Sequence, residues 1–246
     1  MQISDRALLY GCGVFTTIRI VDRFPFRWNE HWLRLLVHAD KIGLVGVPSE
    51  QVIRRTIQPL IKGFLAGRVR ITLLDHRPSA LWESTEKIPN QDFYILVGKV
   101  AALPTSFHLS ISPYPTQSGS PLAGIKSCNY LEPLMSLDEA KGRGFHEAIR
   151  VNECGFVTSA CLANVFWLKR GELFTPSLAT GCLAGTTREF ILENINCREV
   201  EAPIDVLDGA DAIFLTSAGI GVVHVAAFDE RRFERIDHPI MHLLPY

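Results

Sequence analysis

The segment Ala123-Gly-Ile-Lys-Ser-Cys-Asn-Tyr-Leu131 places one lysine, Lys126, among small and apolar residues just before a stretch with helical spacing. A lysine in such surroundings tends to have a lowered pKa, because burial disfavours its charged form. The neutral amine is then a usable Schiff-base nucleophile. The alternative is a solvated surface lysine, which the local sequence alone favours. Other segments of the chain are therefore needed to decide between a Schiff-base lysine and a solvated one.

A candidate partner is Gly181-Cys-Leu-Ala-Gly-Thr-Thr-Arg188, which precedes an apolar helix that Thr186 or Thr187 can cap. N–H groups and hydroxyls at a helix N-terminus suit a phosphate, although a plain helix cap is the alternative. Arg34, flanked by leucines, either reaches a buried phosphate bidentately or extends to solvent. The segment matches neither the P-loop pattern nor GxGxxG, so nucleotide binding is not indicated.

The composition is that of an ordinary globular protein. The chain has 246 residues, 47% hydrophobic and 21% charged, with a formal net charge of -1. Lys and Arg form no basic stripe, so we expect neither nucleic acid nor a membrane as partner. The N-terminus has no apolar region typical of a signal peptide. Six cysteines without CxxC spacing are typical of reduced thiols in a cytoplasmic protein.

Hydrophobic periodicity predicts helices and strands along the whole chain. Apolar residues recur at helical spacing over Trp32–Ile42, with Asn29 as the expected cap, and again from Ser49 to Phe64. Further helices are expected at Tyr130–Lys141 and Thr186–Asn194. The expected strands are Gly13–Ile20, Phe24–Arg27, Val69–Leu74, Phe93–Val97, Phe107–Ile111, Glu147–Val151, Phe156–Thr158, Val165–Lys169, Glu172–Thr175, Ala212–Thr216 and Gly221–Ala227. Hairpins are expected at three turns, Val21-Asp22-Arg23, Glu153-Cys154-Gly155 and Arg170-Gly171.

A loop rich in Pro, Ser and Gly over 112–120 is the expected boundary between two domains. The predicted organisation is an N-terminal α+β domain over 1–111, this interdomain loop, and a C-terminal α+β domain over 121–246 that carries Lys126. A cleft between two such domains is a usual place for a small-molecule site. No metal site is expected, because the histidines lack HExxH or comparable ligand spacing.

Several motifs follow one another in order along the chain. They are Asp5-Arg-Ala-Leu-Leu-Tyr-Gly-Cys-Gly-Val-Phe-Thr-Thr-Ile-Arg19, His31-Trp-Leu-Arg-Leu35, Ile125-Lys-Ser-Cys-Asn-Tyr-Leu131, Val157 to Trp167, Thr175-Pro176 and Leu183-Ala-Gly-Thr-Thr-Arg188. Together they resemble the opening strand, the HxxRL helix, the Schiff-base segment and the later motifs of the class IV aminotransferases and lyases. These are two-domain α+β enzymes of fold type IV that use pyridoxal 5'-phosphate. The resemblance covers nearly the whole chain.

The resemblance implies roles for residues around the cofactor. Lys126 would be the Schiff-base lysine and would shuttle protons, and Tyr130 would hydrogen-bond the phenolic oxygen of the cofactor. The remaining cofactor ligands that it implies are Arg34, Asn164, Thr186, Thr187, and the backbone around Ser217 and Ala218. Tyr10 would line the substrate side. The family usually forms homodimers, which is the expected assembly here.

Other details resemble the lyase branch of the family, which converts 4-amino-4-deoxychorismate to 4-aminobenzoate and pyruvate for folate biosynthesis. Phe15-Thr16-Thr17 is similar to the lyases, whereas branched-chain aminotransferases commonly have Phe-Glu-Gly. By this resemblance Thr17 is a candidate to relay a proton to the leaving enolpyruvate, and Arg77 to meet a substrate carboxylate. The alternatives are a D-amino-acid or branched-chain aminotransferase, and a binding protein that kept the fold without the chemistry.

One position departs from the family pattern. The acidic residue that pairs with the pyridine nitrogen stands five positions before the motif asparagine, and this count from Asn164 leads to Ser159. A serine hydrogen-bonds a neutral nitrogen but supplies no counter-charge, so the electron sink is expected to be weaker. The enzyme is then slower or narrower, or an acidic group elsewhere substitutes, or catalysis has been lost.

Overall fold

The computed structural model describes residues 5–79, 81, 93–100 and 102–245. It divides into two compact units, Met1–Ala101 with Ile125–Tyr130, and Ala102–Gly124 with Leu131–Tyr246. This division differs from the expected one in two ways. The loop over 112–120 lies inside the second unit, because β5 (His108–Ile111) pairs with β6 (Glu147–Val151). The segment with Lys126 returns to the first unit, because Ser127 bridges to Val14.

The sheet of the first unit has the strand order β2-β1-β3-β4. It contains β1 (Gly13–Val21), β2 (Phe24–Pro25), β3 (Ala66–Leu74) and β4 (Phe93–Gly98). The predicted hairpin is confirmed, since Val21 pairs with Phe24 around Asp22 and Arg23, both in the left-handed region. Before it lies a short helix that the sequence analysis did not predict, α1 (Arg6–Tyr10), which the Asp5 side chain caps.

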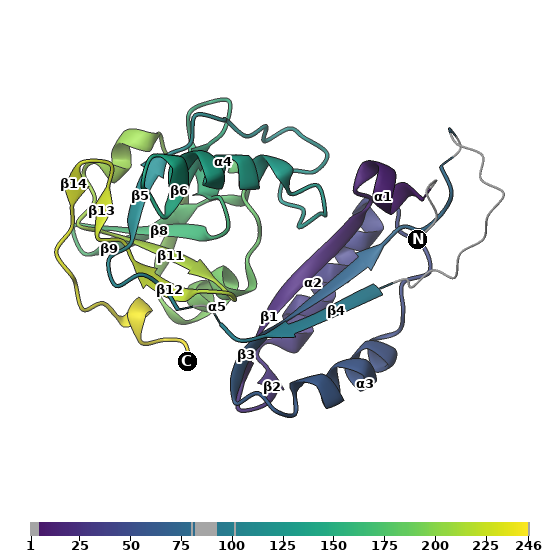
Figure 1. The fold of residues 1–246 in the computed structure, drawn as a ribbon. Helices are drawn as coiled ribbons and strands as arrows, with labels where there is room; N and C mark the ends of the chain where they lie inside the picture. The colour runs from purple at the N-terminus through teal and green to yellow at the C-terminus, as the bar shows by residue number, and fades with distance from the viewer. Residues whose placement is uncertain (1–4, 80, 82–92, 101, 246) are drawn as a thin grey trace. The chain divides into compact units, whose positions relative to one another are not determined.

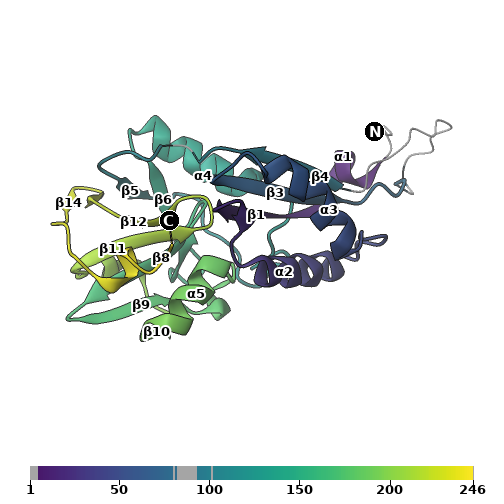
Figure 2. The ribbon, with the colours of Figure 1, turned by 90° about the horizontal axis from the view of Figure 1, so that it is seen from below.

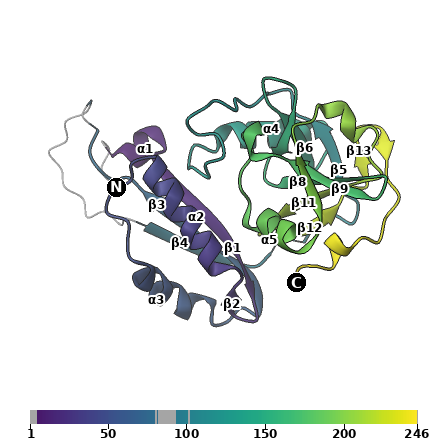
Figure 3. The ribbon, with the colours of Figure 1, turned by 180° about the vertical axis from the view of Figure 1, so that it is seen from behind.

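Two helices cover one face of this sheet, as the opposite views in Figure 1 and Figure 3 show. They are α2 (Trp28–Lys41) and α3 (Glu50–Ile61). Val14, Ile18 and Ile71 point toward them and form the core with alternate strand residues. The expected cap of α3 by Ser49 is confirmed. The expected cap of α2 by Asn29 is wrong, because the helix begins one residue earlier, after Arg27 in the left-handed conformation.

The second unit contains two five-stranded sheets, with orders β10-β9-β8-β11-β12 and β14-β13-β5-β6-β7. The strands not yet located are β7 (Val157–Ala160), β8 (Asn164–Lys169), β9 (Glu172–Pro176), β10 (Cys197–Val200), β11 (Ala212–Ser217), β12 (Gly221–His224), β13 (Ala227–Phe228) and β14 (Arg231–Arg232). The strand expected over Gly221–Ala227 is thus two short strands in different sheets. Both predicted hairpins, β6–β7 and β8–β9, are confirmed.

Residues from both sheets of the second unit form one common core, which includes Leu109, Val165 and Ile213. The alternate residue Phe166 faces a second cluster under α5 (Thr186–Asn194). Helix α4 (Leu131–Gly142) packs on β5 and β6, and Figure 1 shows α4 and α5 on opposite sides of this unit. Short 3-10 turns η1 (Leu178–Thr180), η2 (Ile204–Leu207) and η3 (Pro239–Met241) complete it. Strand β8 is buried on both faces.

Candidate functional site

The lysine segment is a short extra strand along the start of β1. The N–H of Phe15 donates to the carbonyl of Lys126 at 3.0 Å, and the N–H of Cys128 donates to Gly13 at 2.8 Å. A glycine is required at position 13, because a Cβ there would lie 2.6 Å from the Leu74 side chain. The segment therefore lies against the first unit, where the sequence analysis placed it in the second domain.

The amine of Lys126 is surrounded by aromatic rings. It donates to the Tyr130 hydroxyl at 3.3 Å and lies 4.5 Å from the centre of the Phe15 ring. Burial, together with the positive charges of Arg34 and Arg70, lowers the pKa of Lys126 to about 7. The predicted lowering of this pKa is confirmed. Close to neutral pH about half of the amine is therefore uncharged, which is the form that a nucleophile or a base requires.

Arg34 projects from α2 toward β1. Its Nη2 donates to Thr16 Oγ1 at 3.1 Å, and the same hydroxyl lies 2.7 Å from His31 Nδ1. The Thr16 oxygen accepts from Arg34, and a neutral His31 ring can take part in the second hydrogen bond as either donor or acceptor. Burial and the charge of Arg34 lower the pKa of His31 well below its usual value, in agreement with a neutral ring. Helix α2 thus holds Arg34 in one orientation.

Arg70 is a site residue that the sequence analysis missed. Its guanidinium lies 3.5 Å from the centre of the Phe15 ring, and its Nε donates to Thr72 at 3.2 Å. Thr17 is its register partner on β1, so Phe15, Thr17 and Arg70 share the sheet face turned away from α2. Burial lowers the pKa of Arg70. The alternation of arginine and apolar residues along β3 was the signal that could have identified it.

The two residues expected on the substrate side lie elsewhere in the first unit. Tyr10 shares a hydrogen bond of 2.9 Å with Ser79. Arg77 is bound bidentately by Asp75, at 2.8 and 2.7 Å, and donates to the Gly43 carbonyl at 2.8 Å. These hydrogen bonds lower the pKa of the Asp75 carboxyl. The structure therefore brings Arg70, and not Arg77, next to Lys126.

In the second unit the start of α5 forms a close-packed anion cradle. Its N-cap is Gly185 and not a threonine, and no side chain in the described residues caps this helix. A Cβ at Gly185 would overlap Asn164 Oδ1, whose amide donates to the Leu183 carbonyl at 2.8 Å. Thr186 and Thr187 follow as buried residues of the first turn. The N–H groups at the start of a helix are donors suited to an anion.

The end of β11 lies in the same unit. Ser217 Oγ accepts from the Ile220 N–H at 3.4 Å in the turn that also contains Ala218. The preceding hydroxyl, Thr216 Oγ1, is buried and has no hydrogen-bond partner within the described residues. Buried polar groups are normally satisfied, so an unpaired hydroxyl beside this turn agrees with a site for a polar ligand.

Ser159 lies on β7, where its register partner is Arg150 on β6. The buried Arg150 forms an ion pair with Glu132 at the start of α4. Directly opposite residues of an antiparallel pair have their side chains on the same face. The cross-strand neighbour of Ser159 is therefore Arg150, whose charge is already paired with Glu132.

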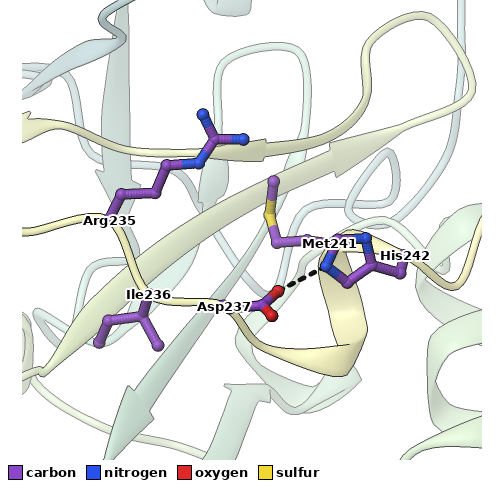
Figure 4. Close-up of a pocket in the computed structure, with 5 residues that line it drawn as sticks. All are labelled: Arg235, Ile236, Asp237, Met241 and His242. Carbon is purple, nitrogen blue, oxygen red and sulfur yellow. Dashed lines mark hydrogen bonds and ion pairs between the residues drawn. The ribbon is translucent and has the colours of Figure 1, made fainter.

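A hollow near the C-terminus contains none of the predicted site residues. Its volume is about 260 Å³ and it is lined by Arg235, Ile236, Asp237, Met241 and His242. Figure 4 shows the imidazole of His242 beside the carboxylate of Asp237, at 2.5 Å. In Figure 2 this part of the chain lies next to the C-terminus. Both side chains are largely exposed.

No group of three or more His, Cys, Asp or Glu side chains in the described part of the chain is placed to hold a metal ion. None of the helices in these ranges is both long and apolar enough to span a membrane.

In the first unit a low-pKa lysine lies beside a tyrosine, and in the second unit a helix begins without a side-chain cap from the described residues. Each feature by itself suits a pyridoxal-phosphate enzyme. Residues 13–228 match the sequence profile of the family described as amino-transferase class IV, so the chain belongs to this family of enzymes. Its cofactor is pyridoxal 5'-phosphate. The fold is that of fold-type IV enzymes, as predicted.

Individual relatives are similar along most of their length. The aminodeoxychorismate lyase of Bacillus subtilis (strain 168) is 25% identical, over 92% of this chain and 80% of the relative. A putative branched-chain-amino-acid aminotransferase of Methanocaldococcus jannaschii is 26% identical, over 94% and 83%. The solved structure of a putative 4-amino-4-deoxychorismate lyase from Legionella pneumophila has a TM-score of 0.82 and 26% identity, over 98% of this chain and 91% of that one.

The residues present fit this cofactor within each unit. Lys126 supplies an amine that is about half neutral near pH 7. The uncapped start of α5 supplies N–H groups for a phosphate, and Thr216 supplies an unpaired buried hydroxyl. Ser159 fits less well than the acidic residue of the family, because it provides no charge.

Proposed function

We propose that this protein is a lyase that converts 4-amino-4-deoxychorismate to 4-aminobenzoate and pyruvate. The observation that carries the proposal is the amine of Lys126, held by Tyr130 and Phe15 with a pKa of about 7, beside the arginine Arg70. The Phe15-Thr-Thr17 sequence and the similarity to two proteins described as lyases support it. In this proposal the protein acts in folate biosynthesis.

Pyridoxal phosphate, when bound, supplies an electron sink that stabilises negative charge on the substrate carbon next to the amino nitrogen. The amine of Lys126 holds the cofactor and then, once released by the substrate, takes the proton from C4. Its hydrogen bond to Tyr130 orients the lone pair for this transfer. The C3–O bond then breaks and enolpyruvate leaves as the ring becomes aromatic. No oxidant, reductant or water is consumed.

Two further residues complete the proposed chemistry. Thr17 shares a sheet face with Phe15, and we propose that its hydroxyl relays a proton to the departing enolpyruvate, which becomes pyruvate. Arg70 lies on the same face without a carboxylate partner among the described residues, and we propose that it binds a substrate carboxylate. This role moves from Arg77, whose guanidinium already binds Asp75.

The phosphate of the cofactor needs donors from charged and backbone groups. We propose Arg34 for this role, with the start of α5 at Thr186 and Thr187. The turn at Ser217 and Ala218 supplies further donors, and Asn164 orders the loop before α5 through its bond to Leu183. Tyr10 is retained as a proposed neighbour of the substrate. The expected homodimer and cytoplasmic location also stay predictions.

The experiment begins with the absorption spectrum of the purified protein loaded with pyridoxal phosphate. Borohydride reduction followed by peptide mapping should trap the cofactor on Lys126. The loaded enzyme, given 4-amino-4-deoxychorismate without any keto acid, should release 4-aminobenzoate and pyruvate in equal amounts. Lys126→Ala should abolish both results, whereas Lys62→Ala, at an exposed lysine of the same unit, should change neither. Full activity in Lys126→Ala would refute the role of this lysine.

The alternative function is an aminotransferase for branched-chain or D-amino acids, as relatives from Methanocaldococcus jannaschii and Bacillus licheniformis are described. An aminotransferase converts the bound cofactor to its pyridoxamine form with an amino acid alone, and a keto acid restores it. A lyase releases 4-aminobenzoate without that cycle. If the protein takes up no cofactor at all, both enzymatic proposals fail. A binding role would then be the better account, and the serine at position 159 in place of the acidic residue of the family would support it.

A further inference from the structure

The backbone N–H of Lys126 has an unusual hydrogen-bond partner. The carbonyl of Lys126 and the N–H of Cys128 pair with β1, as neighbouring strands do. The N–H of Lys126 points the other way and donates to Nδ1 of His38 at 3.0 Å. The two residues are 88 positions apart. The His38 side chain therefore accepts the hydrogen bond of a backbone N–H that has no neighbouring strand among the described residues to pair with.

The burial, the position on α2 and the neutral state of His38 all suit this contact. It is 5% exposed and lies on the face of α2 that also carries His31 and Arg34, at seven and four residues before it. For Nδ1 to accept a hydrogen bond, the ring must be neutral with its proton on Nε2. Burial, together with the charges that face it on Arg34, Lys41 and Lys126, lowers the pKa of His38 to about 4.

We propose that His38 is a positioning residue: its neutral imidazole fixes the backbone of Lys126, so that the amine stays against Tyr130 and Phe15. The proposal rests on the proposed role of Lys126 as the cofactor lysine, but not on which reaction follows. Helix α2 then sets two parts of the site at once, since Arg34 contacts Thr16 one turn before His38. A misplacement of about 1 Å at a reacting group can cost roughly 100-fold in rate.

The direct test uses the protein without cofactor. In ¹⁵N-labelled protein, a coupling across the hydrogen bond should connect the Lys126 amide nitrogen with His38 Nδ1. The Lys126 amide should exchange with deuterium slowly. In His38→Leu, which fills the space without an acceptor, exchange of that amide should become at least 10-fold faster. In His38→Asn, whose Oδ1 can replace Nδ1, exchange should return to within about threefold of the original.

The loaded enzyme provides a second readout. His38→Leu should lower kcat about 10-fold or more with KM nearly unchanged, and His38→Asn should restore most of it. Leu35→Ala is the matched control, because it removes core packing from the same helix without touching Lys126. That variant should lower the melting temperature and leave the Lys126 amide protected under native conditions.

The possible failures are distinguishable. If the wild-type protein shows the coupling and the slow exchange but releases no 4-aminobenzoate, the proposed function fails and the positioning role survives. If the protein is an active lyase and His38→Leu leaves amide exchange and kcat unchanged, the positioning role fails alone. Equal losses in His38→Leu and His38→Asn would mean that the histidine acts through its shape, which also overturns the proposal.

Discussion

The charge of Arg70 should be one cause of the low pKa of Lys126, and this is open to a quantitative test. The substitution is Arg70→Gln, which removes the charge and keeps a polar side chain on the same face of β3. The guanidinium and the amine both lie over the Phe15 ring, at 3.5 and 4.5 Å from its centre, so the charges are at most about 8 Å apart.

Two unit charges about 8 Å apart interact with roughly 2 kcal/mol at an effective dielectric constant of 20, and with roughly 0.5 kcal/mol in bulk water. One pH unit of pKa corresponds to about 1.4 kcal/mol. Removing Arg70 should therefore raise the pKa of Lys126 by roughly 0.4 to 1.5 pH units. Most of the lowering should remain, because burial is its largest cause and Arg34 is still present.

The assay is the pH dependence of amine labelling in the cofactor-free protein. A reagent that reacts only with neutral amines is applied between pH 5 and 11, and the Lys126 peptide is quantified by mass spectrometry. The control is Arg68→Gln, at an exposed arginine two residues along the same strand. It should leave the midpoint within about 0.2 pH units, since charges near solvent are screened. A wild-type midpoint near 10.5, or identical midpoints in both variants, would refute the reasoning.

Three further predictions follow from the same structure. Folded His38 stays neutral to about pH 4 while the unfolded chain takes up its proton near pH 6.5, so stability falls as the pH drops through this window. In urea titrations His38→Asn should flatten that fall by up to about 1.4 kcal/mol per pH unit, and parallel curves would contradict the assignment. Lys126→Met should stabilise the cofactor-free protein by up to about 5 kcal/mol below pH 7. That gain should vanish as the pH approaches 10.5, because only the unfolded lysine binds a proton between pH 7 and 10.5. Gly185→Ala should cost about 1–3 kcal/mol and weaken cofactor binding, because its Cβ displaces the Asn164 amide; wild-type stability and affinity would count against this close contact.

Local periodicity was sufficient for most elements of the fold. The helix at Thr186–Asn194 and the two-residue turn at Arg170 and Gly171 formed as predicted, because spacing, capping and turn chemistry act over a few residues. The errors fell at element ends. Asp5 caps a short helix that the hydrophobic pattern did not predict, and Arg27 precedes α2, which begins before the expected cap. End effects depend on one or two side-chain hydrogen bonds, which a hydrophobic pattern does not record.

The sequence by itself determined the family, the cofactor and the identity of the candidate lysine, through an ordered set of motifs in one chain. Only the tertiary structure decided what surrounds that lysine. Ser127 bridges to Val14 and His38 binds the Lys126 amide across 88 residues, which places the lysine segment on the first unit. The choice between Arg70 and Arg77 also came from the folded chain. Both arginines lie on or near β3. Only the folded structure shows that Asp75 forms an ion pair with Arg77, and that Arg70 lies over the same Phe15 ring as the Lys126 amine. Contacts between distant residues, and the loss of water around them, determine the pKa values of these side chains. Neither can be read from the local spacing of residues in the sequence.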